Sequence, residues 1–146
     1  MHYLCQMNRF ITTELIGKTS RLITNNLSQK ILLAKIDITT EQWILLQILS
    51  KSSKTQKELG NITVKNKASI NSLISYLLKQ EYINKSISQK DKRETIIQIT
   101  ELGEDIRKMV LKEASEAINE TMKGFSNSEI ELLNSMLKRI NNNLIK

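Results

Sequence analysis

The chain contains no proline and only four glycines among its 146 residues. Proline breaks a helix interior and glycine weakens one, so their scarcity allows long uninterrupted helices. The single cysteine, Cys5, excludes an intrachain disulfide and fits a reducing compartment. Together with the single histidine, His2, it cannot supply a His/Cys metal cluster or a Cys–His catalytic pair. We therefore expect no metal, no cofactor and no enzymatic activity.

Long apolar runs are also missing. The run from Trp43 to Leu46 is far shorter than the ~20 residues that a membrane-spanning helix needs. Arg9 lies among polar residues rather than ahead of an apolar core, so no signal peptide is recognisable. The hydrophobic content of 40% is that of a globular protein with one core. These features predict a single cytoplasmic domain over residues 1–146, without a membrane partner.

What the chain does have is positive charge, concentrated in its middle third. Residues 51–100 have a net charge of +6, whereas residues 1–50 have +2 and residues 101–146 have −1. A localised positive field favours a polyanion, because neutralised phosphates release their counterions. A solvated lysine-rich surface would have the same composition, so charge alone does not identify a nucleic-acid binder.

The segment from Thr55 to Leu102 has the order helix, turn, helix, hairpin. Thr55 and Glu58 have the spacing of a capping box, which predicts a short helix through about Ile62. Asn66 is a good N-cap for the next helix. The buried face of that second helix is predicted from apolar residues at i, i+3, i+4 and i+7, namely Ile70, Leu73, Ile74 and Leu77. This order is typical of a winged helix-turn-helix.

The other face of this second helix is polar and suits a DNA major groove. It consists of Ala68, Ser69, Asn71, Ser72, Ser75, Tyr76 and Lys79, and Lys65 and Lys67 lie at its entrance. Asparagine can pair with adenine, and serine can bond several base edges. We therefore take Lys65, Lys67, Ser69, Asn71, Ser72 and Ser75 as candidate DNA-contacting residues. A plain solvent-facing surface is the alternative interpretation.

A β-hairpin with a basic loop is expected next, from two runs at residues 84–88 and 95–100. The loop contains Lys90, Lys92 and Arg93, which we add to the candidate DNA contacts. Arg93 suits a minor groove, whose negative potential attracts guanidinium groups. Asp91 has the wrong sign for phosphate, so we expect it to orient a neighbouring basic side chain by a charge-assisted hydrogen bond.

Long helices are expected on both sides of this segment. The first spans roughly Leu4 to Ile36, with an apolar or small stripe through Ile16, Ser20, Ile23, Leu27, Ile31 and Ala34. Thr39 and Gln42 form a capping box that opens a helix with Trp43 in the core. Thr100 is expected to cap a helix through about Lys123, which Gly124 ends.

Ser126 and Glu129 open a last helix. Its apolar residues follow a 3,4 spacing that suits packing against another helix: Ile130, Leu133, Leu137, Ile140 and Leu144. The spacing does not decide whether the partner helix belongs to the same chain or to a second subunit.

Several segments in this order resemble the MarR family of bacterial transcriptional regulators. The wing residues Asp91 and Arg93 match the family's Asp-x-Arg motif, and residues 99–103 match its Leu-Thr-Glu-x-Gly segment. Residues 38–43 and 55–59 resemble its Leu-Thr-x-x-Gln-Trp and Thr-Gln-x-Glu-Leu segments. The chain departs from the family at Ser72, where an arginine is common, and at Glu81, where a glycine is common.

The resemblance implies a mainly α fold with a small β-hairpin wing, in which a winged helix-turn-helix (residues 38–103) lies between dimerisation helices (residues 1–37 and 104–146). It also implies a homodimeric, sequence-specific regulator, most simply a repressor, that binds double-stranded DNA at a near-palindromic operator and is released by a small apolar effector. Its dimer interface would include Ile16, Ile23, Ile130, Leu133, Leu137, Ile140 and Leu144.

Two alternatives stay open. A helical interaction module could use the basic patch on an acidic partner. A thiol-based redox sensor of the same fold could act through Cys5.

Overall fold

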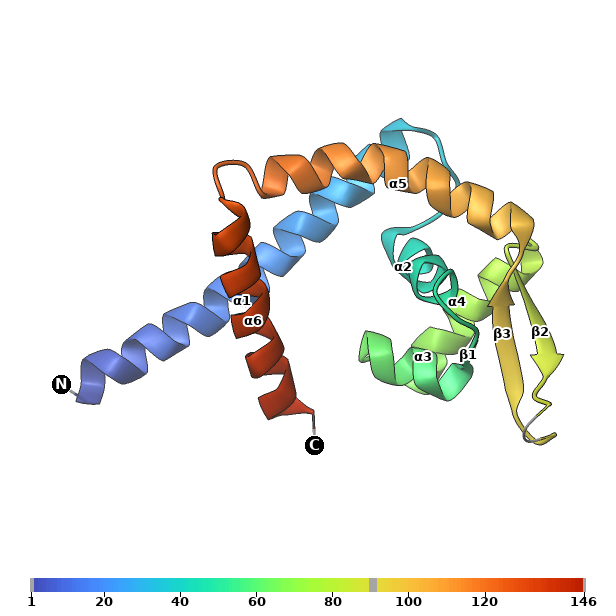
Figure 1. Cartoon of the computed structure of the whole chain (residues 1–146), viewed down its shortest axis with the longest axis horizontal. Helices are drawn as coiled ribbons and strands as arrows, with labels where there is room; N and C mark the ends of the chain where they lie inside the picture. The colour runs from blue at the N-terminus through green and yellow to red at the C-terminus, as the bar shows by residue number, and fades with distance from the viewer. Residues whose placement is uncertain (1, 90–91, 146) are drawn as a thin grey trace.

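The computed structural model describes residues 2–89 and 92–145, with side chains from residue 6 onward. Within these residues the chain forms six helices and one three-stranded antiparallel sheet. Figure 1 shows two parts. We call residues 38–100 the head, and the helices α1 (His2–Leu33), α5 (Glu101–Thr121) and α6 (Asn127–Leu144) the frame. The expected class, a mainly α winged helix-turn-helix with a small β wing, is confirmed.

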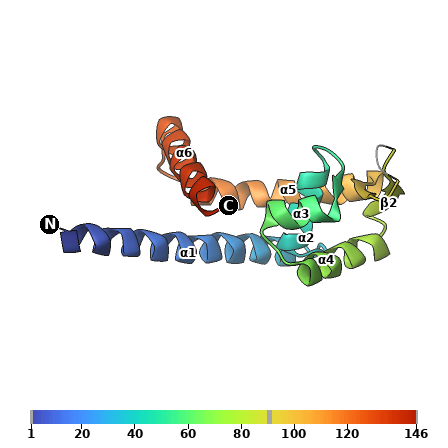
Figure 2. The same ribbon diagram turned by 90° about the horizontal axis from the view of Figure 1, so that it is seen from below.

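The C-terminal part of α1 (His2–Leu33) packs against α5 (Glu101–Thr121). Leu27 and Ile31 of α1 belong to the same buried cluster as Val110 and Ala114 of α5. The Lys30 ammonium lies 3.4 Å from Glu116 and 3.5 Å from Glu120, and these carboxylates raise the pKa of Lys30. Both views show the N-terminal part of α1 projecting beyond the head (Figures 1 and 2).

The end of α1 differs from the expected boundary at Ile36. The helix stops at Leu33, because Lys35 adopts a left-handed backbone with φ 56°. The N–H of Ile36 then bonds back to the carbonyl of Ile31, which closes the helix end.

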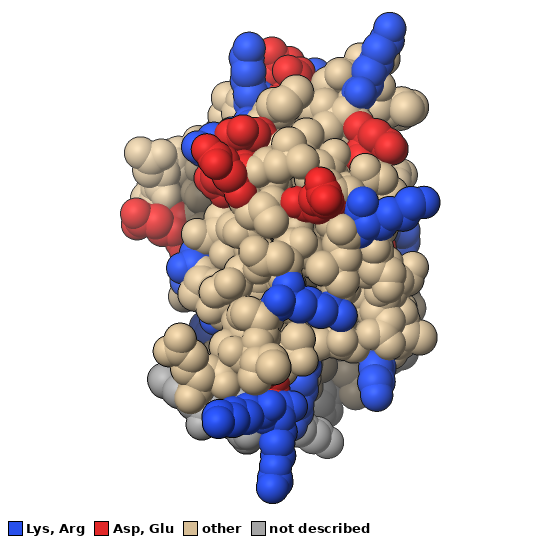
Figure 3. Space-filling view, turned by 90° about the vertical axis from the view of Figure 1, so that its right-hand side faces the viewer, with Lys and Arg blue, Asp and Glu red and all other residues tan. Residues whose placement is uncertain are grey.

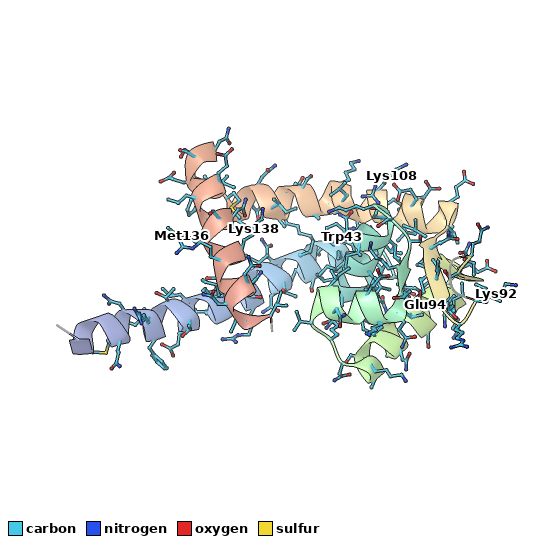
Figure 4. The ribbon with its side chains drawn as sticks, turned by 60° about the horizontal axis from the view of Figure 1, so that its bottom comes forward. Trp43, Lys92, Glu94, Lys108, Met136 and Lys138 are labelled. Atoms are coloured by element: carbon cyan, nitrogen blue, oxygen red, sulfur yellow. The ribbon has the colours of Figure 1, made fainter. Side chains whose placement is uncertain are left out.

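The core of the head is centred on α2 (Thr40–Leu49), which begins with the predicted capping box of Thr39 and Gln42. Leu45 and Leu46 are fully buried. Trp43 is also buried, which confirms its core position, and its indole N–H donates to the carbonyl of Arg107 in α5 at 3.2 Å (Figure 4). This hydrogen bond joins the head directly to the frame.

The sheet has the order β1 (Lys54–Thr55), β3 (Thr95–Ile99), β2 (Ile83–Ile87). The hairpin of β2 and β3 pairs Ile83 with Ile99 and Ile87 with Thr95, close to the predicted runs. The expectation of two strands was incomplete, since β1 pairs with the other side of β3. Two residues in a polar stretch carry no β pattern, so the sequence did not indicate this strand.

Residues 99–103, with the sequence Ile-Thr-Glu-Leu-Gly, connect the wing to α5. Thr100 caps α5 as predicted: its hydroxyl accepts from the N–H of Gly103 and donates to the carbonyl of Glu81 at 2.7 Å. A Cβ atom at Gly103 would lie 2.0 Å from the carbonyl oxygen of Tyr82, so only glycine fits. Glu81 itself has a left-handed backbone with φ 59°. Glycine adopts this conformation most easily, which accounts for the glycine that is common at this position in the MarR family.

The C-terminal boundaries need one small correction. The helix α5 ends at Thr121, two residues before the expected Lys123. Gly124, with φ 88°, then lies in the turn to α6 (Asn127–Leu144), which begins with the predicted capping box of Ser126 and Glu129.

None of the helices within residues 2–89 and 92–145 combines the length and the apolar character that a membrane span requires.

Gly103→Ala should lower the free energy of unfolding by about 3 kcal/mol, because the added methyl group meets the Tyr82 carbonyl and neither backbone segment can move freely. Urea unfolding measures the change. The matched control is Gly17→Ala in α1, where the new Cβ meets only the Arg21 side chain at 3.8 Å. The control should stabilise the protein by about 1 kcal/mol, as alanine does relative to glycine in a helix interior. Equal effects of the two substitutions would contradict the close contact at Gly103.

Candidate nucleic-acid interface

The helix-turn-helix consists of α3 (Gln56–Thr63) and α4 (Lys67–Lys79). The predicted capping box of Thr55 and Glu58 starts α3, and it lowers the pKa of Glu58 because the backbone and hydroxyl of Thr55 donate to the carboxylate. Val64 turns the chain with φ 53°. The side chain of Asn66 then caps α4 by accepting from the N–H of Ser69, as predicted.

Burial fixes which face of α4 points outward. Ile70, Ile74 and Leu77 are buried, whereas Leu73 is only half-buried. The exposed side chains include five of the predicted DNA-contacting residues, which are Lys67, Ser69, Asn71, Ser72 and Ser75. These five therefore share one accessible, polar surface.

Tyr76 corrects the expected outward face. It is half-buried, and its hydroxyl donates to the carbonyl of Asp37 at 2.9 Å. Burial and this hydrogen bond raise the pKa of Tyr76. The residue thus links α4 to the segment between α1 and α2 and does not belong to the exposed face of α4.

Lys65 is held by an ion pair that the sequence did not indicate. Its ammonium lies 2.5 Å from a carboxylate oxygen of Glu41, in the first turn of α2. The Lys65 side chain is only 25% exposed. Part of the positive charge expected at the entrance of α4 is therefore offset within the protein.

Gln56 also contributes to this surface and was missed. Its Nε2 donates to Oδ1 of Asn71 at 2.5 Å, across the two helices of the motif. The two positions are 15 residues apart and belong to different helices. Sequence periodicity relates residues within one element, so it carried no signal for this contact.

The wing supplies the positive charge at the outer end of the head. Lys92 and Arg93 are exposed, and Figure 4 shows Lys92 extending away from the body. The N–H of Ser88 donates to the carbonyl of Glu94 at 2.9 Å and extends the pairing toward the loop. The candidates Lys90 and Asp91 lie outside the described residues.

The acidic side chains on the wing end of the molecule are concentrated on one side. In Figure 3 they gather in the upper half, among several lysine and arginine side chains, whereas lysine and arginine predominate in the lower half around the wing tip. The first turn of α5, which carries Glu101 and Glu104, lies at the upper end. An approaching polyanion would therefore meet the wing tip and not the start of α5.

A second group of predicted residues meets between α1 and α6. Ile16 and Ile23 of α1 line a mostly apolar cavity of about 500 Å³ together with Leu133 and Leu137 of α6. The remaining dimer candidates, Ile130, Ile140 and Leu144, lie on α6: the first two are half-buried and the third is exposed. No residue of α6 is fully buried within the described chain. An 18-residue amphipathic helix thus leaves most of its apolar stripe uncovered.

Another cavity, of about 380 Å³, lies where the frame meets the head. Its walls come from the end of α1, from residues 36–40 and from Tyr76, and they combine apolar side chains such as Ile31 and Ile36 with the hydroxyls of Ser28 and Thr40.

Within the described residues, no group of three or more His, Cys, Asp or Glu side chains is placed to hold a metal ion.

The family model of the SarA/Rot transcriptional regulators matches residues 27–110. The repressor IacR from Pseudomonas putida is 25% identical over 77% of this chain and 68% of its own. A mutant of MarR from E. coli, solved with operator DNA, has a TM-score of 0.77 at 20% identity and covers 91% of this chain and 96% of its own. BpsR from Bordetella bronchiseptica, whose DNA binding is regulated by 6-hydroxynicotinic acid, has a TM-score of 0.77 at 16% identity, over 88% of this chain and 91% of its own.

Proposed function

Because the chain belongs to the SarA/Rot family of transcriptional regulators and has the MarR winged-helix fold, we propose that it represses transcription by binding a near-palindromic operator as a homodimer. It is a regulator of the MarR type and not an enzyme. The observation that carries the proposal is the exposed polar face of α4 beside a basic wing.

The two parts of this surface have different roles. The exposed face of α4 enters the major groove, where Ser69, Asn71, Ser72 and Ser75 bond base edges. Lys67 contacts phosphate at the start of the helix. In the wing, Lys90 and Lys92 contact phosphates, Asp91 orients the loop and Arg93 enters the minor groove. Lys65 contacts a phosphate only when its ion pair with Glu41 is broken.

The uncovered stripe of α6 supports the homodimer. Several large apolar side chains on α1 and α6 are exposed, including Phe10 (65%), Leu15 (56%), Leu132 (56%) and Met136 (47%). Leaving so much apolar surface in water costs about 25 cal/mol per Å², so a partner that covers it is favoured. A second copy supplies the same self-complementary surface, with Ile16, Ile23, Ile130, Leu133, Leu137, Ile140 and Leu144 at the interface.

Release by a small effector is supported by the cavity between frame and head. A ligand there contacts α1, residues 36–40 and Tyr76 of α4 at the same time. A ligand that binds better to one angle between head and frame shifts the population of that angle. The mixture of apolar walls with a few hydroxyls suits a small aromatic compound.

Arg93→Ala should weaken binding to operator DNA by about 5- to 100-fold if the guanidinium reads the minor groove. The slope of log affinity against log salt should also fall by about 1, because one cation is lost. Fluorescence anisotropy across a salt series measures both quantities.

The control for Arg93→Ala is Lys123→Ala, which removes the same charge from the exposed turn after α5, at the other end of that helix from the head. It should leave both quantities nearly unchanged. If Arg93→Ala bound every DNA duplex with unaltered affinity and salt slope, the alternative of an acidic protein partner would replace the DNA-binding proposal.

Leu133→Asp should convert a dimer into monomers, because it buries a charge in the apolar interface. Operator affinity should fall at the same time. Sedimentation velocity measures the assembly state. Asn134→Asp adds the same charge on the adjacent, polar side of α6 and should leave the dimer intact. A wild-type protein that sediments as a monomer at operator-binding concentrations would exclude the homodimer.

A further inference from the structure

We propose that Gln56 decides which base Asn71 reads, by fixing the orientation of the Asn71 side-chain amide. This inference rests on the proposed function, since it assumes that the exposed face of α4 lies in the major groove. It adds a residue of α3 to a recognition surface that the sequence assigned to α4 and the wing alone.

The backbones of both residues are firmly placed. Gln56 is the first residue of α3 and follows Thr55, which is held by the capping box and by pairing with Ile96 of the sheet. Asn71 follows Ile70, which is 1% exposed and anchors its turn of α4 in the core. The hydrogen bond of 2.5 Å therefore joins two side chains that project from fixed points.

The direction of this hydrogen bond sets what Asn71 offers to DNA. A primary amide carries one acceptor oxygen and two N–H donors, and an unrestrained asparagine can present both at once, as it does to adenine. Here Oδ1 points to the Gln56 amide, so Nδ2 points away from it. Asn71 then presents donors to the groove, which suit the acceptors N7 and O6 of guanine.

Recognition explains this hydrogen bond better than folding does. Asn71 is exposed, and a hydrogen bond at the protein surface contributes little to stability, because water replaces either partner. Two ordered amides on an exposed surface instead reduce the entropy lost when a base is bound.

The experiment begins with the wild-type protein and random-sequence DNA duplexes. Selection gives a preferred site, and Asn71→Ala identifies the base pair at which preference depends on Asn71. Four duplexes that differ only at this pair are then compared by competition binding with wild type, Gln56→Ala and Gln56→Glu.

We expect wild type to prefer guanine at this position by about five-fold or more. Gln56→Ala frees the Asn71 amide and should allow adenine to bind as well as guanine. Glutamate has a similar shape but only accepts hydrogen bonds, so Gln56→Glu should turn the Asn71 amide around. Its exposed oxygen should then favour a donor, cytosine N4 or adenine N6, and the preference should reverse.

Lys57→Gln is the control for charge, since it changes the net charge by the same amount as Gln56→Glu at the neighbouring, exposed position. It should weaken all four duplexes equally and keep the preference for guanine. If both Gln56 variants, shown to be folded by circular dichroism, retained the wild-type preference, the role of Gln56 would be overturned while the proposed function stood. If wild type selected no sequence, the proposed function itself would fail.

Discussion

The close approach of Gly103 to the Tyr82 carbonyl fixes how the wing leads into the frame. At this point the end of α4, the first strand of the wing and the start of α5 come together. The Thr100 hydroxyl fixes the junction by bonding on one side to Glu81 and on the other to Gly103. The hydrogen bond from the Trp43 indole to Arg107 then holds α2 against the same helix. The orientation of the head on the frame follows from these contacts.

The Arg107 side chain strengthens this connection. Its guanidinium bonds the Glu104 carboxylate and donates to Oε1 of Gln47 in α2 at 2.7 Å. The hydrogen bonds from Arg107 lower the pKa of Glu104. In the proposed homodimer a rigid junction matters, because two heads that must meet two half-sites need a fixed separation.

On the candidate DNA-binding surface, the hydrogen-bonding groups and the positive charge lie in different places. The exposed face of α4 is polar and lacks an arginine at Ser72, whereas the positive charge lies in the wing and at the start of α4. Glu41 offsets part of that charge by pairing with Lys65. In the proposed mode of binding, phosphates and the minor groove supply most of the affinity, and a few amide and hydroxyl groups supply the base preference.

Local features of the fold could be predicted from the sequence. The capping boxes at Thr39, Thr55 and Ser126 and the caps at Asn66 and Thr100 all form where their spacing indicated, because each involves residues three apart in one helix end. The exposed face of α4 followed from helical periodicity in the same way, except at Tyr76.

The features that the sequence did not reveal are contacts between distant segments. The pairing of β1 with β3, the hydrogen bond from Tyr76 to Asp37, the ion pair of Lys65 with Glu41 and the hydrogen bond of Gln56 with Asn71 each join different elements. Such pairs depend on the folded arrangement, so no spacing along the chain marks them. They are also the contacts that adjust the candidate site.

In the proposed mode of binding, the frame of a homodimer holds two heads at a fixed separation on DNA. The most direct test is operator affinity as a function of the number of base pairs inserted between the two half-sites of the selected site. Fixed heads require half-sites about one helical turn (~10 bp) apart, so an insertion of about five base pairs should place them on opposite faces and reduce affinity to that of a single half-site. Affinity that does not change with this insertion would contradict a homodimer with fixed heads.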